Sequence, residues 1–263
     1  MSISPLKQIK AKFKQILKNV FFYLQRVGIK KIPTQIKEQL PHDHSAFTQG
    51  LAYRAPYLYE STGLDDASSL RKLDAKTGKL QQKIAVTNSW AEGIALAGTQ
   101  IIQLTWHDGI ARVFNHDSLE LETQRHYQGE GWGLTDAPNG LIMSNGSSTL
   151  RFLDTEFNLQ KELRVTMNGL PVKHINDICY AQSLILCNIW YREEVLIISP
   201  VSGKVIAILD TSQLKELAKV YHPDAVQNGI AYNAQDNLLY LTGKHWPVIF
   251  TVSFPDKGLY QSD

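Results

Sequence analysis

Three glutamates, Glu60, Glu92 and Glu130, stand beside glycine, serine or an indole in well-separated parts of the chain. A carboxyl group walled by apolar rings has a raised pKa, so it can accept a proton in one step of a reaction and return it in the next. Cationic or amide donors could stabilise an oxyanion formed on the way. Residues of suitable type to complete such a pocket are Gln49, Gln103, Trp106, Trp132, Asn176, Trp190 and Lys244. Together these residues predict acid–base chemistry, provided that the fold gathers them.

Other chemistries leave no recognisable motif in this sequence. His-Glu-x-x-His, Cys-x-x-Cys, Gly-x-Ser-x-Gly and the phosphate loop are all absent. His42-Asp43-His44 has metal-ligand side chains but no further ligands at the spacing of a metal site. Cys179 and Cys187 are too few for a disulfide scaffold, and they predict either two buried thiols or one bridge across a hairpin.

The candidate residues recur because the sequence repeats itself beyond residue 40. Five segments are similar: Thr48–Tyr53, Ala91–Leu96, Gly131–Asp136, Asn176–Tyr180 and Gln227–Tyr232. With Gly50, Gly93, Gly133, Ile178 and Gly229 as anchors, their separations are 43, 40, 45 and 51 residues. Periods of about 40–50 residues with strand-like content are typical of propeller blades.

Each repeat continues with further strand-like segments. Second strands are predicted at Leu58–Gly63, Ile102–Trp106, Leu141–Gly146, Leu186–Trp190 and Leu239–Lys244. Third strands are predicted at Ser69–Asp74, Ala111–Asn115, Thr149–Asp154, Val195–Ser199 and Val248–Ser253, and turns then lead into a fourth. We therefore predict an all-β fold, a five-bladed β-propeller. The fifth unit lacks a fourth strand, so we expect residues 31–40 to supply it and close the ring.

The predicted blades bring the candidate residues to one place. In an antiparallel meander, the start of the first strand and the end of the second lie at the same end of the sheet. The candidates occupy these two positions, so we expect them to surround one mouth of the central channel, together with Trp246. Glycines such as Gly131 and Gly133 would let the backbones crowd at the hub while Glu130 and Trp132 face the mouth.

The charge of the chain is uneven. The first 37 of 263 residues carry nine of the 27 Lys and Arg and none of the 25 acids, which leaves 18 basic against 25 acidic residues, a net of −7, in the rest. This acidic body, without a basic–aromatic stripe, argues against a nucleic-acid partner. The apolar content of 43% fits one folded domain, residues 31–263, behind a leader of residues 1–30.

Apolar residues recur in the leader at spacings of three and four, with lysines between them, which predicts a basic amphipathic helix. Its longest apolar run, Val20–Leu24, is too short to span a bilayer, and no signal-cleavage site follows. The leader therefore predicts a surface-lying membrane anchor, a helix packed on the body or a loosely ordered tail. Cytoplasmic residence, with or without membrane association, and anchored export are both compatible with it.

Longer motifs between about Pro41 and Pro255 resemble those of the glutamine cyclotransferase family of plants and bacteria. They are Pro41-His42-Asp43, Phe47-Thr48-Gln49-Gly50-Leu51, Glu60-Ser61-Thr62-Gly63, Ser68-Ser69-Leu70-Arg71, Glu92-Gly93-Ile94, Gln103-Leu104-Thr105-Trp106, Gly131–Thr135, Asn188-Ile189-Trp190, Asn228–Ala231 and Leu241–Pro247. The resemblance implies a five-bladed propeller, an acyltransferase that converts the N-terminal glutamine of peptides or proteins into pyroglutamate and releases ammonia without zinc.

The resemblance also implies roles for the candidate residues. Glu60 and Glu92 are implied as acid–base or amine-binding carboxylates, and we rank Glu60 first, Glu92 second and Glu130 third. The residues implied to shape and polarise the pocket are Gln49, Trp106, Trp132, Asn176, Trp190 and Lys244. We expect no required cofactor, and a structural calcium in the channel stays open. Departures from the family pattern, which leave the substrate preference open, are Asn176-Asp177-Ile178-Cys179 in place of Asn-Glu-Leu-Glu, together with Trp90 and Asn145.

Two other functions are weighed against this one. A non-catalytic propeller would bind peptide or protein N-termini without releasing ammonia, and the altered acids are compatible with that alternative. A metal-dependent lactonase would need a carboxylate-rich channel floor, for which the sequence offers too few convergent acids.

Overall fold

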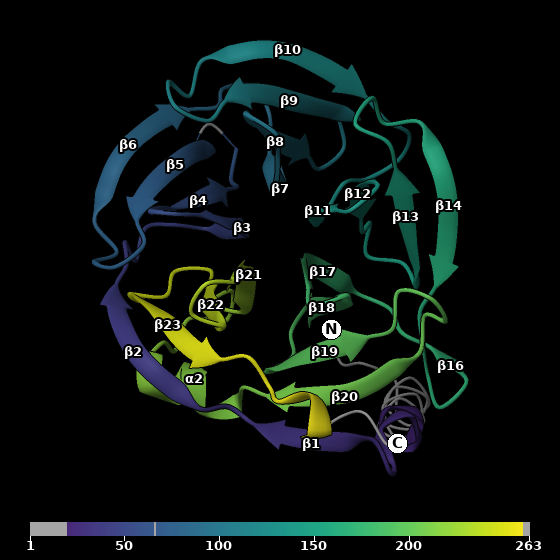
Figure 1. Ribbon diagram of the computed structural model, residues 1–263. Coiled ribbons are helices and arrows are strands. Elements are labelled where there is room, and N and C mark those ends of the chain that lie inside the picture. Colours follow the sequence, from purple (N-terminus) through teal and green to yellow (C-terminus); the bar gives the residue numbers. More distant parts are fainter. Residues whose placement is uncertain (1–19, 66, 260–263) are drawn as a thin grey trace, which may run out of the picture.

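The computed structural model describes residues 20–65 and 67–259, in which five large sheets are arranged around a central axis (Figure 1). The first blade consists of β3 (Thr48–Arg54), β4 (Tyr57–Thr62), β5 (Ser69–Asp74) and β6 (Leu80–Ala85). The second consists of β7 (Ala91–Ala97), β8 (Gln100–Thr105), β9 (Ile110–Asn115) and β10 (Leu121–His126). The third consists of β11 (Leu134–Ala137), β12 (Gly140–Met143), β13 (Thr149–Leu153) and β14 (Leu159–Arg164).

The last two blades include strands from the beginning of the described chain. The fourth contains β17 (Ile175–Ala181), β18 (Leu184–Ile189), β19 (Glu194–Ile198) and β20 (Val205–Asp210), with β1 (Lys30–Pro33) parallel to β20. The fifth contains β21 (Gln227–Asn233), β22 (Leu238–Gly243) and β23 (Val248–Ser253), with β2 (Ile36–Pro41) antiparallel to β23. The predicted five-bladed, all-β architecture is confirmed.

Strands become more exposed from the hub outward. β8 (QIIQLT) and β18 (LILCNI) are almost entirely buried and largely apolar, because neighbouring blades cover both faces of each sheet. The outer strands β10 (LETQRH) and β14 (LQKELR) are polar and mainly exposed. Apolar clusters fill the spaces between blades, so the core is divided into wedges that meet at the axis.

The innermost strands β3, β7, β11, β17 and β21 surround the axis (Figure 1), and glycine makes their close approach possible. A Cβ atom added to Gly93 would lie 2.6 Å from the Cα of Gly133, and one added to Gly50 would lie 2.9 Å from the Cα of Gly93. These contacts are closer than a side chain tolerates. The predicted crowding of glycine backbones at the hub is therefore confirmed.

Buried polar side chains tie the innermost strands to one another. The carboxylate of Asp177 accepts hydrogen bonds from the backbone amides of Ile230, at 2.8 Å, and Leu51, at 3.4 Å. Burial raises the pKa of Asp177 well above its ordinary value, and these backbone hydrogen bonds oppose the shift. The shortened acid of the Asn176–Cys179 segment thus links three blades beneath the mouth of the channel.

In the part of the chain that the structure describes, few helices accompany the sheets. They are α2 (Ser212–Ala218), the 3-10 turn η1 (Lys257–Leu259) and a helical stretch at residues 20–26, and a hairpin of β15 (Thr166–Met167) and β16 (Leu170–Pro171) stands beside the last of these. Most of the predicted leader helix, residues 1–19, lies outside the described residues. Within the described part, no helix is long and apolar enough to cross a membrane. Cys179 and Cys187 are free and buried, as the first of the two interpretations predicts.

Candidate active site

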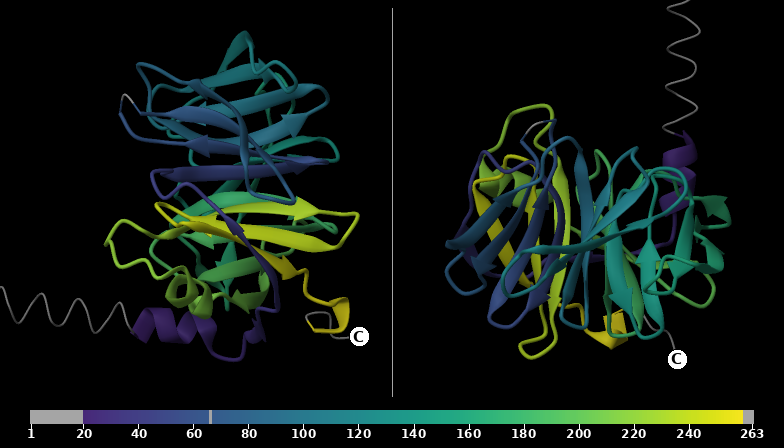
Figure 2. Two further views of the ribbon diagram at one scale, coloured as in Figure 1. Left: turned by 90° about the vertical axis from the view of Figure 1, so that its left-hand side faces the viewer. Right: turned by 90° about the horizontal axis from the view of Figure 1, so that it is seen from above.

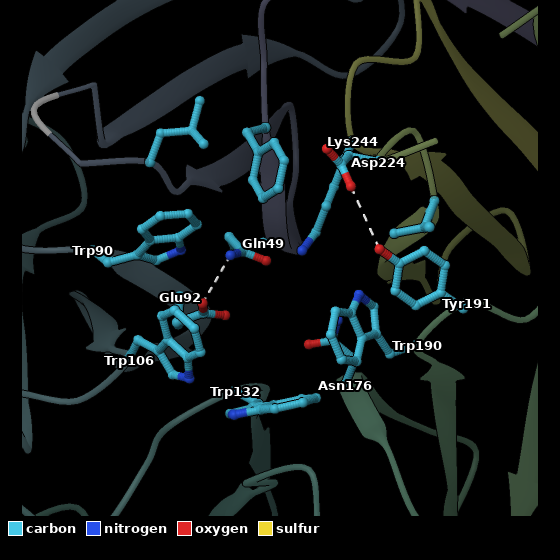
Figure 3. A pocket seen from close by; sticks show the side chains of 13 residues that line it. Gln49, Trp90, Glu92, Trp106, Trp132, Asn176, Trp190, Tyr191, Asp224 and Lys244 are labelled. Carbon is cyan, nitrogen blue, oxygen red and sulfur yellow. Dashed lines mark hydrogen bonds between the residues drawn. The ribbon is translucent and has the colours of Figure 1, made fainter. Parts of the chain in front are cut away.

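A cavity of about 310 Å³ opens at one end of the hub (Figure 3). It is lined by residues of β3, β7 and β17 and by residues next to β8, β18, β21 and β22, which belong to the first, second, fourth and fifth blades. The third blade contributes Trp132, which precedes β11. The lining residues are Phe47, Gln49, Leu64, Trp90, Glu92, Trp106, Trp132, Asn176, Trp190, Tyr191, Asp224, Val226 and Lys244. Starts of first strands and ends of second strands thus meet here, as the meander geometry predicts.

Most of the residues proposed from the sequence reach this cavity. Those that line it are Gln49, Glu92, Trp106, Trp132, Asn176, Trp190 and Lys244. In Figure 3, Glu92 and Lys244 face the cavity from different sides, and the three tryptophans form much of its wall. The structure therefore gathers a carboxylate, an ammonium group, two amides and several indoles in one enclosed space.

Glu60 does not line the cavity, so its expected place in the pocket is wrong. Its Cα pairs with those of Leu51 and Arg71, two residues before the end of β4, which puts it deeper in the sheet than the mouth. The side chain is fully buried and accepts hydrogen bonds from Thr48, at 2.7 Å, and His42, at 2.9 Å, with Arg71 3.7 Å away. Glu60 is therefore part of an ionic network behind the cavity.

Gln103 also lies deeper in its sheet than the mouth of the channel. It lies two residues before the end of β8, is fully buried, and donates hydrogen bonds to Ser61 Oγ at 2.8 Å and the Ser69 carbonyl at 3.3 Å. These contacts hold the first and second blades together. The side chain is consequently unavailable to a ligand in the cavity, and the expected substrate-binding position of Gln103 is wrong.

Glu130 lies at the rim rather than in the lining. One carboxylate oxygen accepts hydrogen bonds from the indole nitrogens of Trp106, at 3.1 Å, and Trp132, at 2.8 Å. Its side chain is 43% exposed. Glu130 therefore fixes the orientation of two indoles, and its charge stands close to the cavity.

One tryptophan expected at the rim, Trp246, does not lie there, and another, Trp90, does. Trp246 is fully buried, donates to the Ala225 carbonyl at 3.2 Å and packs edge-on against Phe250, so its expected place on the rim is wrong. Trp90 stands in the wall instead, with its ring 5.5 Å from that of Trp106.

An aromatic belt surrounds the opening. Phe47, Trp90 and Trp106 form one arm, with neighbouring ring centroids 5.9 and 5.5 Å apart. Trp132 and Trp190 begin the other arm, with centroids 5.7 Å apart, and Glu130 bridges the two arms through its indole hydrogen bonds. Such a belt gives the cavity an apolar wall that restricts water.

Several lining residues were not predicted from the sequence, although two of them carried a signal. Phe47 precedes Gln49 by two residues and Trp90 precedes Glu92 by two, and side chains at that spacing share a face of a strand. Tyr191, Asp224, Leu64 and Val226 come from loops or strand ends without such a pattern.

Glu92 carries the most perturbed proton-binding group of the lining. Burial raises its pKa well above the ordinary glutamate value of 4.5; Lys244 opposes the shift, while the charges of Asp177 and Glu130 add to it. Oε1 of Glu92 accepts a 2.7 Å hydrogen bond from Gln49 (Figure 3). A carboxyl group whose pKa is raised in this way is a stronger base than an exposed glutamate and can take up a proton from a ligand.

Lys244 supplies the positive charge of the lining. Burial lowers its pKa, and the carboxylates of Glu92 and Asp224 oppose that shift. The Nζ atom lies 4.4 Å from the centroid of the Phe47 ring. The side chain is 6% exposed, so its ammonium group is directed into an enclosed space.

Two amide oxygens in the cavity lack partners among the described residues, Gln49 Oε1 and Asn176 Oδ1. The orientation of the Gln49 amide follows from its donation to Glu92, which leaves the oxygen as the unpaired atom. Buried acceptors without a donor cost free energy. They are therefore positioned to accept hydrogen bonds from a ligand that carries N–H groups.

The donor set offers little for a metal ion. In the described part of the chain, no group of three or more His, Cys, Asp and Glu side chains converges as a metal site would require. His42, from the sequence His42-Asp43-His44, is committed to Glu60 and to the Trp246 carbonyl, at 2.7 Å.

Comparisons with known proteins agree with the five-bladed fold. The sequence model of the glutamine cyclotransferase family matches residues 12–254. The chain is 32% identical over 224 residues to a glutaminyl-peptide cyclotransferase of Arabidopsis thaliana, which covers 83% of this chain and 70% of the plant protein. It is similar to the crystal structure of Myxococcus xanthus glutaminyl cyclase with a TM-score of 0.81 and 34% sequence identity, over 85% of this chain and 97% of that one.

Proposed function

The chain belongs to the glutamine cyclotransferase family, and on this premise we propose that it is a glutaminyl-peptide cyclotransferase, an acyltransferase. In the proposed reaction, the α-amine of an N-terminal glutamine forms a bond to the carbon of its own side-chain amide. The amide nitrogen leaves as ammonia, and a pyroglutamyl peptide remains. The substrates are peptides or proteins that begin with glutamine.

The observation that carries this proposal is the environment of Glu92. The reaction needs a group that removes a proton from the attacking amine and delivers one to the departing nitrogen. The α-amine has a reference pKa of about 7.7–8.0, so near neutral pH it gives up its proton readily. Burial raises the pKa of Glu92 well above 4.5, which makes its carboxylate a stronger base towards that amine. Of the three candidate glutamates, we therefore assign the proton transfer to Glu92, because it alone lines the cavity.

Gln49 and Asn176 provide the contacts that we propose for substrate binding. Their unpaired amide oxygens would accept hydrogen bonds from the substrate ammonium group or its side-chain NH₂. Gln49 also donates to Glu92 and would keep that carboxylate aimed at the amine. Because the reaction is intramolecular, the main task of these contacts is to fold the glutamine side chain back onto its amine.

Lys244 is proposed to stabilise the tetrahedral intermediate. Attack by the amine moves negative charge onto the amide oxygen, and a buried ammonium group stabilises such a charge more strongly than water does. The walls formed by Trp106, Trp132 and Trp190 support this role because they limit the access of water, which would otherwise hydrolyse the amide to glutamate.

The remaining proposals concern the frame and the surroundings of the site. We propose one catalytic domain, residues 31–263, closed by β2 on the fifth blade, and a basic amphipathic leader, residues 1–30, that contacts membrane surfaces. We also propose that no metal is required for turnover. Incubation with a chelator should then leave the rate of ammonia release unchanged, and a loss of activity that zinc or calcium restores would contradict this part.

The catalytic proposal is tested with a short peptide that begins with glutamine, by following ammonia release. Glu92→Gln preserves size and hydrogen bonding but removes the exchangeable proton, so kcat should fall about 10²–10⁴-fold. The matched control, Glu162→Gln on the exposed strand β14, should retain full activity. No turnover by the wild-type protein above the spontaneous rate, combined with retained binding of the peptide, would favour the non-catalytic alternative.

A further inference from the structure

A second, larger depression lies beside the cavity. It has a volume of about 1140 Å³ and runs between the helical residues 20–26, the β15–β16 hairpin and the segments 171–174 and 189–192. We call it the leader groove. In both views of Figure 2, residues 20–26 (purple) project from the same side of the propeller as the loop that follows α2, to which the cavity residue Asp224 belongs. The groove therefore opens on the face that carries the cavity mouth.

The leader groove and the cavity share two residues, Trp190 and Tyr191. Trp190 is 37% and Tyr191 55% exposed, and their ring centroids lie 4.7 Å apart. On the cavity side, Trp190 packs edge-on against Trp132, and the Tyr191 hydroxyl donates to Asp224 at 3.4 Å across the rim (Figure 3). The two hollows are thus separated only by an accessible aromatic ridge.

The outer wall of the leader groove is attached to the propeller by specific contacts. The largely buried side chain of Gln25 donates to the Pro171 carbonyl at 2.8 Å, and Asn168 donates to the Val27 carbonyl at 2.7 Å. Arg26 forms an ion pair with Glu194 of β19. The C-terminal end of the helical stretch 20–26 is therefore held against the propeller and forms one wall of the groove.

The lining of the groove combines apolar side chains with positive charge. Two guanidinium groups contact the Phe22 ring: the Cζ atom of Arg26 lies 3.3 Å from the ring centroid and that of Arg192 lies 3.7 Å from it. In the described part of the chain, Arg26 pairs with the carboxylate of Glu194, which also interacts electrostatically with Arg192, so these two neighbouring cations share one anion. Arg192 and Lys173 are exposed cations of this lining, whereas Arg26 is largely buried. A carboxylate from a ligand would complete this charge arrangement.

We propose that the leader groove binds the part of the substrate that follows the N-terminal glutamine, and that it favours apolar side chains followed by a carboxylate. This inference rests on the proposed function, since a peptide whose first residue fills the cavity must continue over the rim. Among the hollows described, the leader groove is continuous with the cavity, whereas the other, near Asp236 and Phe254, shares no residue with it. An extended chain advances about 3.3 Å per residue, so positions two to five would cross the ridge and enter the groove.

We predict that the preference for particular residues after the glutamine lowers KM and leaves kcat nearly unchanged. Residues bound beyond the reacting glutamine contribute equally before and during the reaction, so they lower KM with little change in kcat. We expect a pentapeptide with leucine at position three and glutamate at position five to have a kcat/KM about fivefold higher than the same peptide with lysine at position five, as for partly exposed ion pairs. A glutaminyl dipeptide amide, too short to reach the groove, serves as the reference.

The test compares these three substrates in the wild-type protein and in Arg192→Glu and Lys173→Glu, with Lys83→Glu on β6 as a matched charge reversal away from the face. Arg192→Glu and Lys173→Glu should abolish or reverse the acidic preference and leave turnover of the dipeptide within twofold. Lys83→Glu should change neither. Ammonia release that ignores position five in the wild-type protein, or an equal loss on all substrates in both groove variants, would overturn the inference. Absence of ammonia from every substrate, the dipeptide included, would instead contradict the proposed function.

Discussion

Glu60 and Glu92 are two buried carboxyl groups in one propeller, and their pKa values are shifted in opposite directions. Burial acts to raise the pKa of both. At Glu60 the charge and hydrogen bond of His42, together with Arg71 and Thr48, outweigh burial and lower the pKa. At Glu92 an amide donor and a more distant ammonium group do not outweigh it, and the pKa stays well above the ordinary value.

The difference shows that burial alone does not make a carboxyl group a proton carrier. Glu60 has two cationic neighbours within 4 Å and does not line the cavity, which suits a permanent structural anion. Glu92 has one hydrogen-bonded amide and an open cavity, so a ligand can supply the missing partner. The partners of the carboxyl group and its access to the cavity, and not its burial, separate a structural role from a catalytic one.

The largest expected effect is on folding stability. Glu60→Gln removes the anion from a buried network, which leaves His42 without its counter-charge and Arg71 with only Asp43, at 3.1 Å, so it should lower the free energy of unfolding by about 3–5 kcal/mol. Glu92→Gln replaces a group that already favours its neutral form, and we expect a change within about 1 kcal/mol. Denaturant titration of both variants measures the difference. Equal losses would contradict the assignment of different roles.

The next largest effect is expected on kcat, from a change in the cavity that Glu92 lines. Lys244→Met keeps much of the side-chain volume and removes the charge proposed to stabilise the oxyanion. We expect kcat to fall about 10²–10³-fold, as for the loss of one preorganised donor. A matched change, Lys72→Met in the first blade, removes a buried lysine outside the cavity and should leave kcat near the wild-type value. A loss confined to KM would assign Lys244 to binding instead.

A smaller effect is expected in the pH dependence of stability. The lowered pKa of Glu60 gives stability that is present above 4.5 and is lost as pH falls through the lowered value. The raised pKa of His42 gives stability that is present below 6.5 and is lost as pH rises through the raised value. The unfolding free energy of the wild type relative to His42→Gln should therefore be largest between pH 4.5 and 6.5. A difference that grows steadily with pH would show that the two groups do not form an ion pair.

The sequence predicts the blades well because period and strand chemistry are local properties. Anchors near Gly50, Gly93 and Gly133 fix where each innermost strand begins, and therefore which side chains reach the mouth. The repeat pattern does not show how far below the mouth a residue near a strand end lies. Glu60 and Gln103, each two positions before the end of its strand, were therefore wrongly placed at the rim. Trp246 was misplaced because a turn after β22 directs its ring inward.

Loops and tertiary pairings lie beyond such patterns. Tyr191 and Asp224 meet across the rim although they stand 33 positions apart and belong to no repeated motif. The leader groove needs residues 20–26 to lie against a hairpin more than 140 positions away, a contact that no local spacing encodes. These features required the folded chain.

The central claim, that Glu92 carries the proton in an environment unlike that of Glu60, is tested most directly by the pH dependence of kcat. We predict an acid limb with an apparent pKa above 4.5, which moves down in Glu130→Gln because the charge of Glu130 helps to raise the pKa of Glu92. His42→Gln, which alters the surroundings of Glu60, should leave that limb in place. An acid limb that follows His42→Gln and ignores Glu130→Gln would contradict the account.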